Sequence, residues 1–345
     1  MQIFFYAMKR FVIVLFALSS FVASGQPAKW TQKKFFTVMS YNVENLFDTV
    51  RTEGKNDVEF TPSGKKNWNS SRYYEKLSHI AQTIDSVNPN CLPDIVALVE
   101  VETRQVLVDL SEQEPIKGAG YQCILEEGPD PRGIDCALMY NPNTFRYVSH
   151  KAINVRLKPS NKRTRDMLYV KGLVGKDTLH VFVNHWPSRV GGKDETASKR
   201  AQCADLLRQL TDSLYKANND CNILIMGDMN DEPTDESVYS ILGASELSRF
   251  SQLYNVNYAM KAAGRGTYFY NGEYSMLDNL IVSGNLVRRT KGFRLYGDTG
   301  FIFSPNFISY TDKKGNVMPS RSYSGNYYTG GFSDHYPVYM VFYKK

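Results

Sequence analysis

The chain has 345 residues, of which 42% are hydrophobic and 22% are charged. Such a chain can bury a sizeable core, which excludes a small scaffold that depends on disulfides or metals for its stability. The formal net charge of +6 is mild. The sequence contains no long Lys/Arg run, which excludes a basic nucleic-acid tail. A phosphate-rich substrate is compatible with this charge but is not required by it.

The first 25 residues have the pattern of an export signal. Lys9 and Arg10 precede an apolar run over residues 11–18, and the small residues at 23–25 offer a cleavage site. The apolar run is too short to span a bilayer comfortably. We therefore predict a cleaved signal peptide over residues 1–25 and a secreted or periplasmic protein without a stable membrane anchor. The alternative is a buried N-terminal strand or helix.

Strand-like and helical patterns alternate along the rest of the chain. Strands are predicted at residues 35–41, 95–99, 121–125, 134–140, 145–155, 167–174, 178–184, 222–226, 279–283 and 337–342, and helices at 72–87, 101–110 and 195–216. Runs of strands with helices between some of them predict two packed sheets covered by helices. No linker interrupts the pattern, so we expect one domain over residues 26–345.

Residues 286–332 differ from the rest, because they are rich in Gly, Ser and Tyr and have little periodicity. We expect a long surface insertion, and such loops are usually functional or mobile. The tyrosines at 323–328 suit either a base-stacking platform or an ordinary solvated loop.

Polar side chains stand at the ends of six short apolar segments. The main ones are Asn42, Glu44, Glu100, His185, Asp228, Asn230, Asp278, Asp334 and His335. Each alone is typical of a turn former, a helix cap or a solvated residue. Together they supply the hard oxygen ligands and acid–base groups of a Mg²⁺-assisted phosphoryl-transfer site. Zinc ligands are poorly represented, because no cysteine joins these clusters.

The chain resembles the endonuclease/exonuclease/phosphatase superfamily in the order of its motifs. These are YNVEN, DIVALVEVE, GIDCALMY, TRD, NHWPSR, GDMND, LDNLIVS and SDHYP, between Tyr41 and Pro337. The motifs YNVENLF and NHWPSR are most similar to the corresponding motifs of secreted bacterial members. The resemblance implies an α/β fold, a four-layer sandwich of two packed mixed sheets flanked by helices.

The same resemblance implies a metal site and a hydrolytic centre. Asn42, Glu44, Glu100 and Asp334 are the expected metal-binding residues. Mg²⁺ is the expected ion, although Mn²⁺ or Ca²⁺ would fit the same oxygen ligands. The catalytic residues implied by the motifs are Asp228, Asn230, Asp278, His335 and His185.

Several of these residues have expected partners. Asp278 is expected to orient His335, and Asp135 to be the carboxylate partner of His185. Arg165, in the TRD motif, is expected to contact the scissile phosphate, because a guanidinium binds phosphate in a bidentate manner. His185 and Asn230 are also expected to bind substrate.

Three functions are consistent with these residues. The leading expectation is a metal-dependent phosphodiesterase, a secreted nuclease with a nucleic acid as substrate and no obligate protein partner. The second is a sphingomyelinase-like or a sugar- or inositol-phosphate phosphohydrolase on the same fold. The third is an inactive binding module, against which the complete set of site residues argues.

Overall fold

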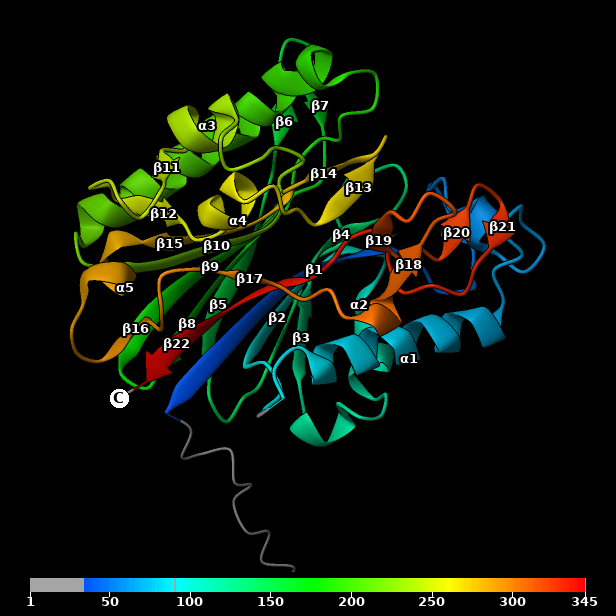
Figure 1. The fold of residues 1–345 in the computed structure, drawn as a ribbon, viewed down its shortest axis with the longest axis horizontal. Helices are drawn as coiled ribbons and strands as arrows, with labels where there is room; N and C mark the ends of the chain where they lie inside the picture. The colour runs from blue at the N-terminus through cyan, green and yellow to red at the C-terminus, as the bar shows by residue number, and fades with distance from the viewer. Residues whose placement is uncertain (1–33, 90, 345) are drawn as a thin grey trace, which may run out of the picture.

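A computed structural model describes residues 34–89 and 91–344, so the predicted signal peptide lies outside the described residues. Two large mixed sheets lie at the centre of the molecule, with helices on their outer faces (Figure 1). The four-layer sandwich expected from the sequence is confirmed. Within the described residues, none of the helices combines the length and hydrophobicity that crossing a membrane requires.

The first sheet, sheet A, has β1 (Phe35–Leu46) near its middle. β1 runs parallel to β2 (Ile95–Val101) and antiparallel to β22 (Val338–Lys344). The remaining strands of sheet A are β3 (Gln122–Leu125), β4 (Asp135–Tyr140), β16 (Phe293–Leu295) and β17 (Phe301–Ile302). Sheet A therefore joins segments from both ends of the described chain.

The second sheet, sheet B, is organised around β10 (Asn222–Asp228). β10 runs parallel to β9 (Asp177–His185) and antiparallel to β15 (Asp278–Ser283). The remaining strands of sheet B are β5 (Arg146–Ile153), β8 (Met167–Val174), β11 (Ala244–Ser245) and β12 (Leu253–Asn255). The predicted strands over 145–155, 167–174, 178–184, 222–226 and 279–283 all lie in this sheet.

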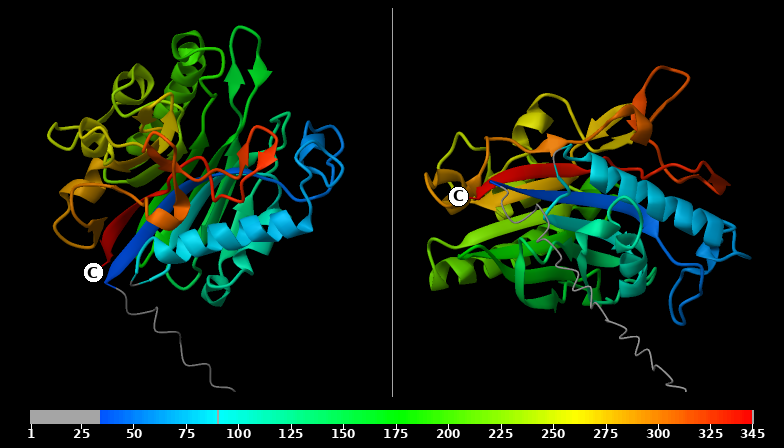
Figure 2. Two further views of the ribbon diagram at one scale, coloured as in Figure 1. Left: turned by 45° about the vertical axis from the view of Figure 1, so that its right-hand side comes forward. Right: turned by 90° about the horizontal axis from the view of Figure 1, so that it is seen from below.

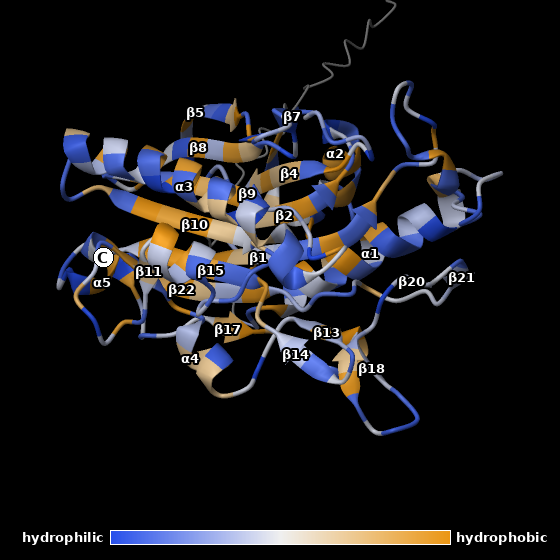
Figure 3. Ribbon diagram, turned by 90° about the horizontal axis from the view of Figure 1, so that it is seen from above, coloured by the Kyte–Doolittle hydropathy of each residue, from blue (hydrophilic) through white to orange (hydrophobic). Residues whose placement is uncertain are grey.

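Side-chain alternation along the strands builds three apolar layers. In β1, Phe36 and Val38 pack between the two sheets, whereas Met39 and Tyr41 face the helices outside sheet A. This period of two is what a strand buried on both faces requires. Figure 3 shows the apolar residues concentrated in central strands such as β10 and the polar residues on the surrounding loops.

Helices α1 (Ser70–Ser86) and α2 (Arg104–Ser111) cover sheet A, and α3 (Lys193–Ala217) covers sheet B. The Asn69 side chain accepts a hydrogen bond from the Arg72 backbone amide and caps the start of α1. α1 buries the apolar face that its spacing predicts, whereas α3 buries Ala204 and Leu207 of its predicted face together with polar residues such as Arg200.

The shorter elements lie mostly in the connections. They are η2 (Val58–Phe60), η3 (Lys117–Ala119), β6 (Arg156–Leu157), β7 (Lys162–Arg163), η4 (Ser237–Ile241), α4 (Tyr258–Ala262), β13 (Tyr268–Tyr270), β14 (Glu273–Ser275), α5 (Gly284–Arg288), η5 (Asn306–Ile308), β18 (Ser309–Thr311), β19 (Val317–Pro319), β20 (Tyr323–Ser324) and β21 (Tyr327–Tyr328). Figure 2 shows the β6–β7 hairpin projecting beyond the sheets.

Residues 286–332 are only partly the surface insertion that the sequence predicts. β16 and β17 both pair with β22 and so belong to sheet A. The remainder folds into the β18–β19 and β20–β21 hairpins, and the second of these lies beside the start of α1 (Figure 1). There the Arg72 guanidinium lies 4.4 Å from the centre of the Tyr328 ring.

Candidate active site

The central strands of the two sheets end at a common cavity of about 720 Å³. Its lining includes Asn42, Glu100, Arg132, His185, Arg189, Asp228, Asn230, Tyr268, Tyr270, Asp334 and His335. Seven residues of the sequence-derived site are among them. The parallel pairs β1–β2 and β9–β10 explain this convergence, because the carboxyl ends of parallel strands lie at the same edge of a sheet.

Unusual backbone conformations mark the residues at this edge. Glu44, Glu100 and Asn230 have φ angles of 50°, 69° and 51°, in the left-handed region that is uncommon for residues with a side chain. The pairing of β1 with β2 changes register between Asn42 and Leu46. Such irregularities redirect side chains out of the sheet, and here they direct polar groups into the cavity.

Gly227 has a structural reason to precede Asp228. Its φ angle is 129°, and a Cβ atom at this position would collide with the Asn184 carbonyl of the neighbouring strand β9. Only glycine therefore allows β9 and β10 to approach this closely at their ends. The close approach holds His185 opposite Asp228 in the strand register.

The carboxylate of Asp228 lies at the centre of the polar network. Its Oδ2 atom accepts a hydrogen bond from Asn42 Nδ2 at 3.1 Å, and its Oδ1 atom accepts one from the Asn230 backbone amide at 2.8 Å. Oδ2 also lies 3.8 Å from Nε2 of both His185 and His335. Burial raises the pKa of Asp228 to about 7, although the nearby His335 opposes the rise.

His335 is held by a buried chain of polar groups. Its Nδ1 atom lies 2.7 Å from Asp278 Oδ2, which also accepts a hydrogen bond from Thr267 Oγ1 at 2.5 Å. Burial lowers the pKa of His335, but the carboxylates of Asp278 and Asp228 outweigh it and raise the pKa to about 10. His335 is therefore an imidazolium at neutral pH, with Nε2 directed toward Asp228. The expected contact between Asp278 and His335 is therefore present, and its role in catalysis stays a prediction.

His185 has the opposite electrostatic character. Burial, together with the positive charge of Arg165, lowers its pKa well below the ordinary value, so its ring is neutral. Its Nε2 atom lies 3.7 Å from Glu100 Oε1 and 3.8 Å from Asp228 Oδ2. The two histidines therefore present different charges to the same carboxylate.

The expected pairing of His185 with Asp135 is contradicted by the structure. Asp135 Oδ2 accepts a hydrogen bond from the Gly128 backbone amide at 3.0 Å. Nδ1 of His185 is buried without a hydrogen-bond partner among the described residues. The Gly128 amide and not the His185 ring is therefore the partner of Asp135, and the linear sequence does not reveal this choice.

Arg165 is held by hydrogen bonds to neighbouring segments. Its Nε and Nη2 atoms donate to the carbonyl oxygens of His185 and Trp186, at 3.1 and 2.8 Å, and its Nη1 atom donates to Asp130 at 2.8 Å. The side chain is only 7% exposed. In this structure the guanidinium bonds to the end of β9, the following residue and Asp130, and Arg165 is not among the residues that line the cavity. Its contact with the scissile phosphate stays a prediction.

Two other arginines line the cavity, and the sequence analysis did not single out either as a site residue. Arg189 donates to the Asn230 carbonyl at 2.7 Å and to Asp235 at 3.0 Å. Arg132 lies 3.5 Å from Asp130 and remains 44% exposed. Arg189 lies within the NHWPSR motif, so the motif itself contained a signal for it.

Glu44 lines a second, smaller cavity and is not among the residues that line the main one. Its Oε2 atom accepts a hydrogen bond from the Ser322 backbone amide at 2.6 Å and lies 3.8 Å from Lys76 Nζ. Burial and the nearby Asp334 raise its pKa. Glu44 therefore fixes the backbone at Ser322. Direct ligation of a metal by Glu44 stays a prediction.

The donor chemistry around Glu100 suits a divalent cation. One carboxylate oxygen of Glu100 accepts a hydrogen bond from the Asn45 amide at 2.8 Å, and the other faces the cavity near His185. Burial and the charge of Glu100 raise the pKa of Asp334, so these two carboxylates repel each other. A bound cation would relieve this repulsion.

Within residues 34–89 and 91–344, no group of three or more His, Cys, Asp or Glu side chains forms a metal site by itself. The residues that would hold the ion are therefore Glu100, Asp334 and the carboxamide of Asn42. Ligands from water or substrate would complete its shell, as is usual for Mg²⁺.

Comparison with known proteins agrees with the fold. The sequence matches the profile described as "Endonuclease/Exonuclease/phosphatase family" over residues 37–344. A search of curated proteins gave no match. Among solved structures, an endonuclease/exonuclease/phosphatase family protein from Bacteroides thetaiotaomicron is similar, with a TM-score of 0.56 and 17% identity, covering 90% of this chain and 98% of that chain.

Two further solved structures have the same fold at low identity. TDP2 from D. rerio complexed with a single-strand DNA product has a TM-score of 0.53 and 14% identity, covering 90% of this chain and 99% of that chain. The human Nocturnin catalytic domain with a bound sulfate anion has a TM-score of 0.53 and 17% identity, covering 91% and 96%. At such identities the likeness establishes the fold alone. The family match over nearly the whole described chain establishes more: the protein belongs to the endonuclease/exonuclease/phosphatase family.

Proposed function

We propose that this protein is a divalent-metal-dependent phosphodiesterase that cleaves nucleic acid. The observation that carries the proposal is the placement of Asp228 between a neutral His185 and a charged His335, in a cavity that Asn42 and Glu100 also line. A binding module has no need for a buried base with a pKa near neutrality beside a fixed cation. Hydrolysis of a phosphodiester uses both.

Each residue has a chemical role in this reaction. A cation held by Glu100, Asn42 and Asp334 would neutralise negative charge on the phosphate oxygens. Asp228, with a pKa of about 7, accepts a proton from the attacking water, because a general base works best when its pKa is near the working pH. His335 donates through Nε2 to a phosphate or leaving oxygen, where negative charge builds during the reaction.

A nucleic acid is the substrate that the surroundings of the site favour. Tyr268 and Tyr270 line the cavity, and aromatic rings at such positions stack on bases without sequence preference. Arg132 lines the same cavity and can bind a flanking phosphate. The structural neighbour from D. rerio was solved with single-strand DNA, which supports the same assignment. We also propose export of the protein, on the signal-like residues 1–25.

Hydrolysis assays on purified protein test this proposal. Plasmid DNA, single-stranded RNA, sphingomyelin and inositol phosphates are each incubated with Mg²⁺, Mn²⁺, Ca²⁺ or EDTA. We expect EDTA-sensitive cleavage of a nucleic acid that the Asp228→Ala variant has lost. Asp205→Ala is the matched control, because Asp205 is exposed on α3 and bonds to Gln209.

The assay separates the alternatives. Cleavage of sphingomyelin or inositol phosphates alone would contradict the nuclease assignment and support the phosphohydrolase alternative. Absence of cleavage of every substrate by a folded protein would contradict the enzymatic proposal and support an inactive binding module.

A further inference from the structure

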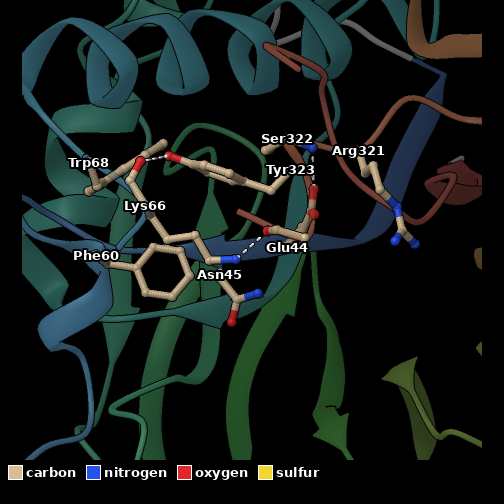
Figure 4. A pocket seen from close by; sticks show the side chains of 9 residues that line it. Glu44, Asn45, Phe60, Lys66, Trp68, Arg321, Ser322 and Tyr323 are labelled. Carbon is tan, nitrogen blue, oxygen red and sulfur yellow. Dashed lines mark hydrogen bonds between the residues drawn. The ribbon is translucent and has the colours of Figure 1, made fainter. Parts of the chain in front are cut away.

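A second cavity, of about 230 Å³, lies near the end of β1 (Figure 4). Glu44 and Asn45 line it, two and three residues after Asn42 in the chain, and the Asn45 amide bonds to Glu100 of the main cavity. On the other side, Arg321 lies 3.6 Å from Asp334, which lines the main cavity. The second cavity therefore lies close to the active site, since Asn45 and Arg321 each contact a residue of the main cavity.

We propose that this second cavity is a base-binding subsite, which holds the base of the nucleotide next to the reacting phosphate while Arg321 contacts a flanking phosphate. The inference rests on the proposed nuclease function and extends it to the recognition of one neighbouring nucleotide. The volume is below the roughly 300 Å³ at which pockets enclose a whole ligand, so it suits one part of a larger substrate.

The aromatic walls of the subsite are fixed before any substrate binds. Phe60 stacks on Phe47, with ring centres 4.4 Å apart and an angle of 17° between the planes. Trp68 donates from Nε1 to the Phe47 carbonyl at 3.0 Å, and the Tyr323 hydroxyl donates to the Lys66 carbonyl at 3.0 Å. Trp68 and Tyr323 are themselves buried, at 1% and 7% exposure, and Lys66 Nζ lies 5.0 Å from the centre of the Tyr323 ring. Phe60 is only partly buried, so it is the ring whose face a substrate can contact. Stacking on an ordered ring favours a flat aromatic group over an acyl chain.

Polar groups accompany these rings. Asn45 lines the cavity, and its carboxamide offers donors and an acceptor to the edge of a base. The backbone of Asn45 is fixed, because its amide donates to Glu100 Oε2 at 2.8 Å. Figure 4 shows the Asn45 carboxamide beside the Phe60 ring, with the Arg321 guanidinium on the far side of Glu44. The subsite therefore combines a stacking face with a hydrogen-bonding group.

The backbone on both sides of Arg321 is held rigidly. The Ser322 amide donates to Glu44, and the Ser322 hydroxyl accepts a hydrogen bond from the buried Lys76 at 2.5 Å. The carbonyl of Ser320 accepts hydrogen bonds from the amides of Phe332 and Ser333, at 2.5 and 3.0 Å. The Arg321 side chain nevertheless remains 44% exposed. A guanidinium presented in this way is suited to a bidentate contact with phosphate.

Equilibrium binding in a background without turnover tests the subsite. The Asp228→Asn variant is titrated in EDTA with a short single-stranded oligonucleotide and with the same strand carrying abasic residues. Adding Phe60→Leu keeps apolar volume against Phe47 but removes the flat ring. We expect it to raise the Kd of the base-containing strand about 5-fold or more, and to leave the Kd of the abasic strand unchanged.

Two further variants sharpen the test. Arg321→Ala is expected to weaken both strands by a similar factor, because it contacts phosphate and not base. Phe250→Leu is the matched control, since Phe250 is 88% exposed and lies against Arg288, outside the site. If Phe60→Leu destabilises the fold, Asn45→Asp replaces it, because Asp tolerates the left-handed backbone; we then expect a changed preference among bases.

The failure of this inference is distinct from the failure of the proposed function. If the parent protein cleaves nucleic acid while Phe60→Leu and Asn45→Asp leave binding and base preference unchanged, the subsite is wrong and the nuclease stands. If the parent neither binds nor cleaves any nucleic acid, both the proposed function and the subsite are wrong.

Discussion

His335 Nδ1 lies 2.7 Å from Asp278 Oδ2, in a position where both side chains are almost inaccessible to water. The hydrogen bond occupies one ring nitrogen and leaves Nε2 to face the cavity. Burial lowers the pKa of His335, but Asp278 together with Asp228 and Asp334 outweighs it, so the pKa is about 10. The pair therefore presents a fixed positive charge to the substrate over the neutral pH range.

Replacement of Asp278 by Asn is expected to lower the upper pH limit of activity. The variant retains the side-chain shape but removes the negative charge that raises the pKa of His335, so the imidazolium is lost at a lower pH. We expect kcat/KM to fall about a hundredfold or more at pH 8, and its alkaline limb to move to lower pH. A pH profile identical in shape to that of the parent would contradict the role of Asp278.

Loss of His335 itself is expected to abolish turnover without unfolding the protein. His335→Ala removes one preorganised donor, which typically costs about a hundredfold or more in rate. His150→Ala is the matched control, because His150 lies in β5 at the edge of sheet B and bonds to Glu126. Steady-state kinetics and thermal melts of both variants make the comparison. Near-parent activity in His335→Ala would remove His335 from the mechanism.

Metal binding is expected to stabilise the fold through Glu100. A ligand that binds only the folded state raises the free energy of unfolding, so Mg²⁺ should raise the Tm of the parent protein. Glu100→Gln should remove most of this increase, because an amide is a poorer ligand for a hard cation. Thermal melts across a Mg²⁺ titration measure the effect, and equal increases in both proteins would exclude Glu100 as a ligand.

The buried pair of Lys76 and Glu44 gives a test of stability. Lys76→Met leaves the Glu44 carboxylate buried without its cation, and breaking such a pair typically costs about 3–5 kcal/mol. Adding Glu44→Gln removes the uncompensated charge, so the double variant should be more stable than Lys76→Met alone. Urea unfolding of the parent, both single variants and the double variant completes the cycle. Strictly additive effects would show that the two side chains do not interact.

The lowered pKa of His180 predicts that the protein loses stability toward acid pH. Burial and, secondarily, Lys171 lower its pKa to about 4, so the folded protein holds this ring neutral. Between pH 6.5 and 4 the unfolded chain binds a proton that the folded protein does not, so stability falls as the pH falls through this window. The effect is about 1 kcal/mol after allowance for solvent screening.

The His180→Gln variant isolates this contribution, because Gln does not titrate. Urea unfolding of parent and variant at pH 7 and pH 4.5 should show the variant gaining relative stability at the lower pH. A difference between the two proteins that is the same at both pH values would rule out the depressed pKa of His180.

The sequence predicted the layers of this fold because local periodicity determines them. The apolar spacing of α1 and the continuous apolar runs of β2 and β10 depend on neighbours in the chain. The short strands β16 and β17 were missed, since each is defined by its pairing with the distant strand β22. Their few residues have no periodicity of their own.

The site was predictable where a motif supplies the side chain and its direction together, as for Asp228 and His335. It was not predictable where the direction depends on distant contacts. Arg165 points away from the cavity because carbonyls of the loop after β9 accept its hydrogen bonds. Arg321 is placed near the site by contacts with distant segments, among them the bond from the Ser322 amide to Glu44, 278 positions earlier in the chain.

The pairing of β22 with β1 has a consequence for biosynthesis. β1 is among the first described segments to leave the ribosome, yet its partner strand and the neighbouring Asp334 and His335 are among the last. Contacts so distant along the chain form late in folding. A chain that ends before residue 334 consequently lacks both a completed sheet A and the charged histidine, so it is unable to carry out the proposed hydrolysis.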